Sequence, residues 1–516
     1  MSKKKHILFY LIVFFLFSQS ARSQFYNLPN DYSFSLLTER GLAAPDSSIH
    51  GGLKPYVHFF SDKYIHVPDT HRVFKYITED PALELIFYKH FLRVEPKKEK
   101  FKLRLDPLLN LELGKDYAGK AGGLLYSNTR GVIGSGYIGD KFYFETMFAE
   151  NQSFFPGYLS ANVQNALVVP GQGRWKTFKG SGYDYAFSSG FISIQPLKNL
   201  NIQLGHGKQK IGNGYRSLLL SDNSFNYPYA RITQQWFKGR VQYTNIYAVF
   251  MNLVSASKVI NPATERLFQK KAASFQYLSV NFTKKFNVGF FQGMIWQAGD
   301  DKNKQHLDLY YFNPIIYTNL INYGLNNKNN IVTGMDAKLK LTSKIALYGQ
   351  LMLDKVKKDS SGWGWQTGIT CFDALGLKNL FLQVEYNSVT KGSYMNSSGS
   401  TTDQSYSHYN QTLAYTPGYG QEFVFIGDYK KKRFFTNVRY NYQTVPMNQG
   451  TIDYYSYVSI LNAKIGYVIN PSYNLNICLG VLYRTQNFSI FNNLNNTTNY
   501  IYLGFKTSLY NLYYDF

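Results

Sequence analysis

The sequence predicts an all-β fold, an antiparallel transmembrane β-barrel of about 18 strands with a small N-terminal periplasmic or plug element. Three observations predict it: an export signal, apolar and polar residues that alternate along many segments, and connections that alternate between short and long. The chain is 17% aromatic, yet its mean hydropathy is only −0.29. A barrel explains this combination because its strands alternate lipid-facing apolar residues with lumen-facing polar ones and carry aromatic girdles.

The N-terminus has the three parts of a secretory signal peptide. A basic start at Lys3–Lys5 is followed by an apolar core at Ile7–Phe17 and by the small residues of Ala21–Ser23. We therefore expect cleavage before Gln24, which makes residues 1–23 the leader. The apolar core is too short to span a bilayer, which takes about 20 residues. A retained N-terminal anchor is the alternative.

Residues 24–100 differ in pattern from the rest of the chain and are expected to form a periplasmic or plug segment. The stretch Pro81–Glu95 predicts an amphipathic helix with Asp80 as its cap. The charged residues at 96–100 then separate this helix from the barrel, which we assign to residues 101–516.

The predicted strands are recognised by a period of two. From Ile331 to Leu341 the odd-numbered residues are mostly apolar and the even-numbered residues mostly polar, as a wall between lipid and water requires. Similar segments begin near residues 103, 124, 140, 183, 199, 228, 240, 271, 285, 330, 344, 363, 379, 421, 432, 457, 473 and 500. The predicted lumen-facing charged residues are Asp336, Lys338, Lys340, Lys464 and Arg484.

The connections between these segments alternate in length. Outer-membrane barrels have short periplasmic turns and long extracellular loops, so the pattern also predicts an orientation. Short connections fall at 139–140, 237–239, 283–285, 342–344 and 470–472. Long ones fall at 150–182, 207–227, 253–270, 299–329 and 390–420.

The C-terminal sequence SLYNLYYDF predicts the strand that closes the barrel. Tyr510, Leu512, Tyr514 and Phe516 share one face, and a terminal aromatic residue is the form that the barrel assembly machinery recognises during insertion. The two cysteines, Cys371 and Cys478, are expected to be unpaired thiols on opposite faces of the wall.

Motifs for cofactors, metals and catalysis are weak. Residues 134–139 match the dinucleotide pattern GxGxxG, but a strand and not a helix follows them. His58, His66 and His71 do not have the spacing of a metal site, and Asp300–Asp301 is a calcium candidate only. We therefore predict no cofactor, no metal and no enzymatic activity. The formal charge of +23 fits an anionic glycan or lipid phosphate better than nucleic acid, because the chain is exported.

The glycine-rich segment 205–232 is the candidate site. Leu218–Leu220 need burial that a free surface loop does not give, so the segment is expected to fold inward and narrow the lumen. Its candidate glycan contacts are Lys208, Lys210, Asn213, Tyr215, Arg216, Asp222 and Asn223.

This segment also resembles a known family. The run Gly207–Gln209, the glycines at 212 and 214, and Ser217–Asn223 followed by Pro228 are similar to the characteristic segment of Wzi-type capsule assembly barrels. Ile211–Gly214 departs from the family's aromatic and proline turn, and Tyr311–Pro314 is a second similar point. The mature start resembles the related RemB-type gliding-motility proteins of the Bacteroidetes, through the residues at 48–50, 54–56 and 105–110.

The resemblance implies a non-enzymatic outer-membrane barrel that attaches or assembles surface polysaccharide, or that serves in cell-surface gliding motility. Its expected partners are outer-membrane lipid, surface polysaccharide, the barrel assembly machinery and proteins of a motility or secretion complex. Two alternatives remain open: a porin-like channel for small solutes, and an accessory subunit of a secretion or motility complex.

Overall fold

The fold is described from a computed structural model of the 516-residue chain. The described residues are 36, 39–41, 43, 50–56, 81–96, 100–119, 123–255, 268–298, 309–325, 329–357, 360–395, 404–449, 451–490, 494–507 and 510–516. The predicted leader, the cap Asp80, the histidines at 58, 66 and 71, and Asp300–Asp301 lie outside them.

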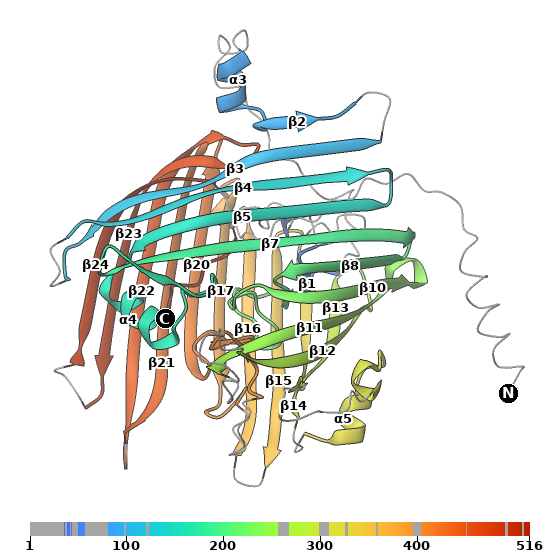
Figure 1. Cartoon of the computed structure of the whole chain (residues 1–516). Helices are drawn as coiled ribbons and strands as arrows, with labels where there is room; N and C mark the ends of the chain where they lie inside the picture. Colours follow the sequence, from blue (N-terminus) through green and yellow to red (C-terminus); the bar gives the residue numbers. More distant parts are fainter. Residues whose placement is uncertain are drawn as a thin grey trace, which may run out of the picture.

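The wall is a closed antiparallel barrel of 18 long strands among the described residues (Figure 1). Each strand pairs with its neighbours along the chain, and the last one returns to the first. This confirms the predicted fold class, and each of the 18 predicted segments overlaps one strand. The strands are β3 (Phe101–Asp116), β4 (Leu125–Ile138), β5 (Phe142–Phe154), β7 (Gly182–Leu197), β8 (Leu200–Gly207), β10 (Tyr227–Trp236), β11 (Val241–Ser255), β12 (Phe268–Asn281), β13 (Phe286–Gln297), β14 (Asn330–Lys340), β15 (Ile345–Lys357), β16 (Ser360–Phe372), β17 (Leu380–Val389), β20 (Gly420–Lys431), β21 (Phe434–Gln449), β22 (Ile452–Asn470), β23 (Leu475–Phe488) and β24 (Asn496–Lys506).

The alternation in the sequence becomes an apolar outside and a polar inside. On β14, Met335 is 40% exposed on the outer face, whereas its neighbour Asp336 is 1% exposed on the inner face. On β15, Leu351 is exposed and Gln350 is buried. An outer face of exposed apolar side chains suits lipid, because the hydrocarbon core offers no partners for polar groups.

The two rims of the barrel differ. Short connections gather at one rim, which we name the turn end, at 139–141, 198–199, 237–240, 282–285, 341–344, 373–379, 432–433 and 471–474. The opposite rim, the loop end, carries the long connections 155–181, 208–226, 298–329 and 390–419. Two connections there, 358–359 and 450–451, are as short as the turns.

The pre-barrel segment places a short helix outside the turn end. Helix α3 (Pro81–Phe87) lies beyond this rim (Figure 1). Ser472 holds it there, because its Oγ donates a hydrogen bond to the carbonyl of Tyr88 (2.7 Å), directly after the helix. The prediction of a helix over residues 81–95 is wrong in its length. Strand β2 (Leu92–Val94) follows instead and pairs with β3.

The seam of the barrel corrects a second prediction. Strand β24 ends at Lys506 and pairs with β3 only from Asn110 to Asp116. The residues Tyr510, Leu512, Tyr514 and Phe516 are not the closing strand, because the chain after Lys506 leaves the wall and turns into the lumen. The freed edge of β3 is paired at Leu103–Leu105 by β2, so its backbone groups keep their partners there.

Small elements lie in the connections. They are β1 (Leu53–Lys54), β6 (Lys176–Phe178), β9 (Lys210–Ile211), β18 (Ser407–His408), β19 (Gln411–Thr412), α4 (Gly157–Ala166), α5 (Thr318–Tyr323), η3 (Phe237–Gly239), η4 (Leu309–Phe312) and η5 (Ala374–Gly376). Within the described ranges, no helix combines the length and the apolar character needed to cross a bilayer. Residues 134–139 form the end of β4 and its turn into β5, which is a strand–turn–strand context. Both cysteines are free thiols.

Candidate functional site: a filled lumen and a basic cavity

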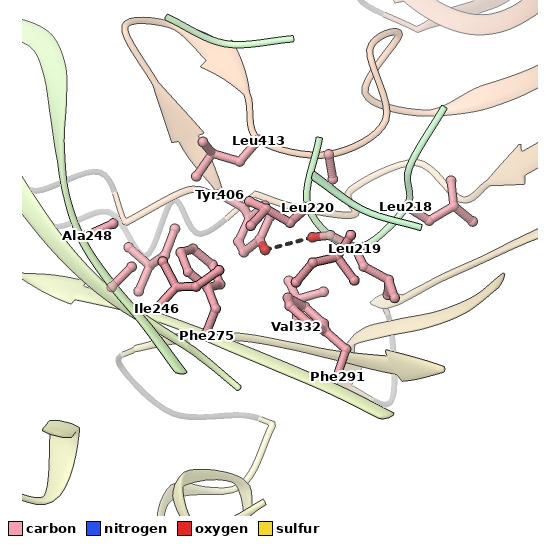
Figure 2. Packing of buried hydrophobic residues seen from close by; sticks show 14 of the residues in the cluster. Leu218, Leu219, Leu220, Ile246, Ala248, Phe275, Phe291, Val332, Tyr406 and Leu413 are labelled. Atoms are coloured by element: carbon pink, nitrogen blue, oxygen red, sulfur yellow. Dashed lines mark hydrogen bonds between the residues drawn. The ribbon is translucent and has the colours of Figure 1, made fainter. Parts of the chain in front are cut away.

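The glycine-rich connection between β8 and β10 lies inside the barrel. Leu218, Leu219 and Leu220 are each 0% exposed and belong to one apolar cluster with inward-facing wall residues such as Phe275 and Val332 (Figure 2). Burying three leucines contributes favourably by about 1.5–3 kcal/mol each. This burial is the physical reason that a long connection folds inward here.

A second long connection, between β17 and β20, packs against the first one. Tyr406 donates a hydrogen bond from its hydroxyl to the carbonyl of Leu219 (2.7 Å; Figure 2), and Tyr394 does the same for Leu218 (2.8 Å). Leu413 lies in the same cluster. The two connections therefore form one packed layer inside the wall.

Two glycines allow the first connection to touch the wall. Gly212 has φ of +141°, and a Cβ there would overlap the amide of Gln350. A Cβ at Gly214 would meet Glu385 Oε2, because the next two backbone N–H groups donate to that carboxylate. Glycine suits both positions, since any side chain would prevent the close approach.

The N-terminal segment reaches the same layer from the turn end. Strand β1 pairs with β9, with Leu53 opposite Ile211. Near the turn end, His50 donates from Nε2 to the carbonyl of Gly239 (2.9 Å), and its Nδ1 lies 2.8 Å from Ser279 Oγ. Burial lowers the pKa of His50 to about 4, so the ring is neutral at pH 7. The lumen is thus filled from both ends.

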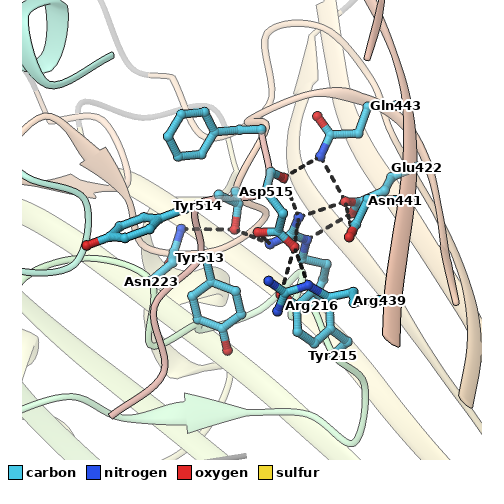
Figure 3. A network of polar contacts seen from close by, with 12 residues as sticks. Tyr215, Arg216, Asn223, Glu422, Arg439, Asn441, Gln443, Tyr513, Tyr514 and Asp515 are labelled. Atoms are coloured by element: carbon cyan, nitrogen blue, oxygen red, sulfur yellow. Dashed lines mark hydrogen bonds and ion pairs between the residues drawn. The ribbon is translucent and has the colours of Figure 1, made fainter. Parts of the chain in front are cut away.

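A buried ionic network joins this layer to the wall and to the C-terminus (Figure 3). Arg216 donates to Glu422 of β20 through Nε (2.9 Å) and Nη2 (2.7 Å), and its Nη1 lies 3.3 Å from Asp515 Oδ1. Tyr215 donates to Asp515 (2.7 Å) and accepts from Arg439 (2.6 Å). Buried ion pairs stabilise only when further hydrogen bonds satisfy the remaining polar atoms, and all three nitrogens of the Arg216 guanidinium have acceptors here.

The wall completes the partners of Glu422. Asn441 and Gln443 of β21 each donate to its Oε1 at 3.0 Å. The carboxylate therefore accepts from the loop and from a neighbouring strand at once, which fixes its orientation.

The other predicted residues of the glycine-rich segment also make contacts within the protein. Lys208 donates to the carbonyl of Gly171 (2.8 Å) and Lys210 to that of Tyr215 (2.9 Å). Burial lowers the pKa of each lysine to about 8. Although burial alone would raise the pKa of Asp222, the charge of Lys210 and hydrogen bonds from the tail lower it.

Asn213 donates to Asp336 (2.9 Å), and Asn223 lies 3.5 Å from Thr416 Oγ1. The seven candidate glycan contacts of this segment are therefore brought together inside the barrel and not on its outer loop surface, with Lys208 and Asn213 half-buried and the rest buried.

The predicted lumen-facing residues lie on the inner face. Lys338 forms an ion pair with Glu39 (3.0 Å), and Arg484 donates to the carbonyl of Phe516 (3.0 Å). Lys340 is half-buried on the same face of β14 as Lys338. Lys464 lines the cavity described below.

The C-terminal tail is held by strand β7 and by the connection that carries α4. Tyr510 stacks on Phe187 with ring centroids 3.9 Å apart, and its hydroxyl donates to Gln172 (2.6 Å). Tyr158 of α4 donates to the carbonyl of Tyr514 (2.9 Å). The tail is thus a fourth element of the lumen filling, and sequence reasoning placed it in the wall.

A cavity of about 660 Å³ lies between the tail, the N-terminal segment and strands β20–β24 and β3. It reaches the turn end, because the exposed turn residues Lys378, Asn379 and Lys432 line it. Its lining carries eight basic residues against three acidic ones. Sequence reasoning found Lys464 alone among them, since the others are brought together only by strand pairing and turns. Within the described ranges, no group of three or more His, Cys, Asp or Glu side chains is placed to hold a metal ion.

Comparisons with known proteins show the fold. No family model and no curated protein matches the sequence. Among solved structures, the chain is similar to Wzi, an outer-membrane protein involved in group 1 capsule assembly in Escherichia coli and a carbohydrate-binding β-barrel, with a TM-score of 0.55 at 12% identity over 94% of this chain and 100% of that chain. OpdK of Pseudomonas aeruginosa with vanillate gives 0.45 at 8% identity over 78% and 98%. A BenF-like porin from Pseudomonas fluorescens Pf-5 gives 0.43 at 12% identity over 80% and 99%.

Proposed function

We propose that this chain is a non-enzymatic outer-membrane barrel with a filled lumen that attaches or assembles surface polysaccharide. Gliding motility is the other cellular setting that the sequence resemblance implies. The observation that carries the proposal is the buried contact of Arg216 with Glu422 and Asp515, which joins loop, wall and tail inside the barrel. A barrel filled at this level is suited to present a rigid surface and not to pass solutes.

The chemistry of the filling supports this role. A barrel of this size encloses an aqueous channel unless loops or inserted segments occupy it. Here the inserted leucines are fully buried, and the charged side chains bond to one another. Opening such a layer would expose apolar surface and leave the partner of each buried charge unsatisfied, which is costly.

The orientation of the barrel follows from its two rims. We place the turn end in the periplasm and the loop end at the cell surface. Cysteine labelling tests this in a background in which Cys371 and Cys478 are serine. Leu494→Cys, exposed at the loop end, should react with a membrane-impermeant maleimide on intact cells. Lys198→Cys, exposed at the turn end, should react only after permeabilisation, and the reverse pattern would contradict the orientation.

Deletion of the gene tests the role itself. We expect the deletion strain to lose cell-attached polysaccharide, with recovery when the wild-type gene is restored. Loss of spreading on agar with normal surface polysaccharide would assign the protein to motility instead. A deletion strain that is normal in both measurements would contradict the proposal.

The porin-like alternative is favoured by one observation, the basic cavity at the turn end. A basic lumen attracts small anions, as a channel would require. The channel and the polysaccharide role are distinguished by whether the purified barrel conducts ions steadily in a lipid bilayer.

A further inference from the structure

The floor of the basic cavity is built by neighbouring strands that bring polar side chains side by side. Asn437 of β21 lies opposite Asp428 of β20 on one side and opposite Lys464 of β22 on the other. Further round the wall, Asn476 of β23 lies opposite Lys506 of β24. All five side chains line the cavity. Amide and ammonium groups thus lie beside one another at two places on the wall.

Glycines make room for flat aromatic rings on this floor. A Cβ at Gly466 would overlap the ring of Phe435, and a Cβ at Gly480 would overlap the ring of Tyr502. Each ring therefore lies across a glycine of the neighbouring strand and along the wall, as in pairs where an aromatic ring covers a glycine. Tyr500 stacks beside Tyr502 with centroids 5.4 Å apart at 21°. Tyr500 and Tyr502 are buried, so these rings close the wall side of the cavity.

The lining of the cavity carries more basic than acidic side chains. Glu112 pairs with Lys506 (3.1 Å), Asp373 pairs with Arg40 (2.9 Å), and Asp428 accepts a hydrogen bond from Asn437 (3.2 Å). Basic residues exceed acidic ones by five around one cavity. Because low-dielectric walls focus the field of such charges, the cavity favours an anionic ligand.

We propose that this cavity binds an acidic oligosaccharide through its sugar carboxylates. The asparagines suit the hydroxyls of a sugar ring, and the lysines suit its carboxylates. A volume of about 660 Å³ is in the range of small-molecule sites and holds a short oligosaccharide or a chain end. Tyr158 and Tyr514 at the inner side limit how far a chain enters from the turn end. The inference rests on the proposed role with polysaccharide and names the ligand class and the side of entry.

Calorimetric titration of the full-length protein in detergent tests the site directly. The probe is trigalacturonate, and maltotriose is the neutral trimer of matched length. The double substitution Lys430→Gln and Lys464→Gln removes two charges from the cavity lining. The matched control, Lys198→Gln and Lys285→Gln, removes two exposed turn-end charges that do not line the cavity.

We expect trigalacturonate to bind the wild type and the control equally and the cavity variant roughly tenfold or more weakly, because two charge-assisted contacts are lost. Maltotriose should bind at least about tenfold more weakly than trigalacturonate. Equal weakening in the control, or equal binding of maltotriose, would overturn the proposal. Displacement of trigalacturonate by an equal concentration of inorganic phosphate would overturn the carboxylate class in favour of phosphate.

A complementation experiment separates this inference from the proposed function. In the deletion strain, the gene with Lys430→Gln and Lys464→Gln should restore less surface polysaccharide than the control gene. Full restoration by the cavity variant would overturn the site while the role stands. A deletion strain with normal polysaccharide would overturn the role, whereas binding of trigalacturonate to the purified protein would still support the site.

Discussion

The guanidinium of Arg216 and the carboxylate of Glu422 form a two-pronged ion pair inside the barrel, although 206 residues separate them in sequence. The contacts measure 2.9 and 2.7 Å, and the side chains are 1% and 0% exposed. Bidentate geometry of this kind is the strongest that arginine offers a carboxylate. The pair fixes the inserted connection to strand β20, so it is the natural point at which to perturb the lumen filling.

Removing one partner of this pair should destabilise the barrel strongly. Glu422→Gln leaves Arg216 buried without its full counter-charge, and we expect a loss of about 3–5 kcal/mol in the free energy of unfolding. Urea unfolding in detergent measures it. The exposed ion pair of Lys100 with Asp140 provides the control, because Asp140→Asn should cost only about 0–1 kcal/mol.

A double substitution separates the effect of the charges of Arg216 and Glu422 from the effect of their packing. Arg216→Met combined with Glu422→Leu removes both charges, so it should be less destabilising than Glu422→Gln alone. The variants Arg216→Met and Glu422→Leu are also measured singly. A double variant whose loss of stability equals the sum of these two losses would contradict the coupling of the two residues.

Acid should loosen the inserted layer through His408. Its Nε2 donates to the carbonyl of Asn226 (3.0 Å) and its Nδ1 accepts from the N–H of Met251 (3.0 Å), which holds the ring neutral. Burial lowers the pKa of His408 to about 3. Between pH 6.5 and 3 the imidazole is therefore protonated in the unfolded chain and neutral in the folded chain. Stability conferred by this group is therefore present above pH 6.5 and falls by roughly 1.4 kcal/mol per pH unit below it.

His408→Asn tests this dependence, because its side-chain oxygen keeps an acceptor for Met251 without titrating. We expect a shallower fall of the urea midpoint between pH 6.5 and 4.5 than in the wild type. His50, with its own lowered pKa, leaves part of the slope in place. Parallel profiles for variant and wild type would show that His408 does not contribute.

The tail should be dispensable for closing the wall. β24 ends at Lys506, so a chain truncated after Leu509 keeps every strand of the barrel. We expect it to refold from urea into detergent with wild-type β-sheet content and a lower thermal midpoint, because the contacts of Tyr510, Tyr513 and Asp515 are lost. If the truncated chain does not form a heat-modifiable barrel, the tail is needed to close the wall and this account of the seam is wrong.

The wall was predictable because one physical requirement repeats along it. Met335 and Leu351 must face lipid, while Asp336 and Gln350 must not, and this leaves a period of two in strands such as β14 and β15. The same period occurs in the tail, at Tyr510, Leu512, Tyr514 and Phe516. Periodicity alone does not show which strand such a segment pairs with, or whether it pairs with any. At Leu103–Leu105 the edge of β3 pairs with β2 and not with the tail. Strand β2 has only three residues and therefore no periodic signal that would have predicted it.

The interior was predictable only in outline. Leu218–Leu220 in a polar connection indicated burial, and the structure places them inside the wall. Their partners were not predictable, because Arg216 meets Glu422 and Asp515 only once the barrel has closed. The basic cavity has the same origin: Lys464 and Lys506 come from different strands and share a site through strand pairing alone.

Single-channel recording tests the filled lumen most directly. Purified wild-type protein in a planar lipid bilayer should show no steady open-channel current. A variant in which residues 212–222 are replaced by a short Gly-Ser linker should conduct, provided that it keeps the heat-modifiable mobility of a folded barrel. A wild-type protein that conducts steadily, with a current equal to that of the variant, would contradict the filled lumen.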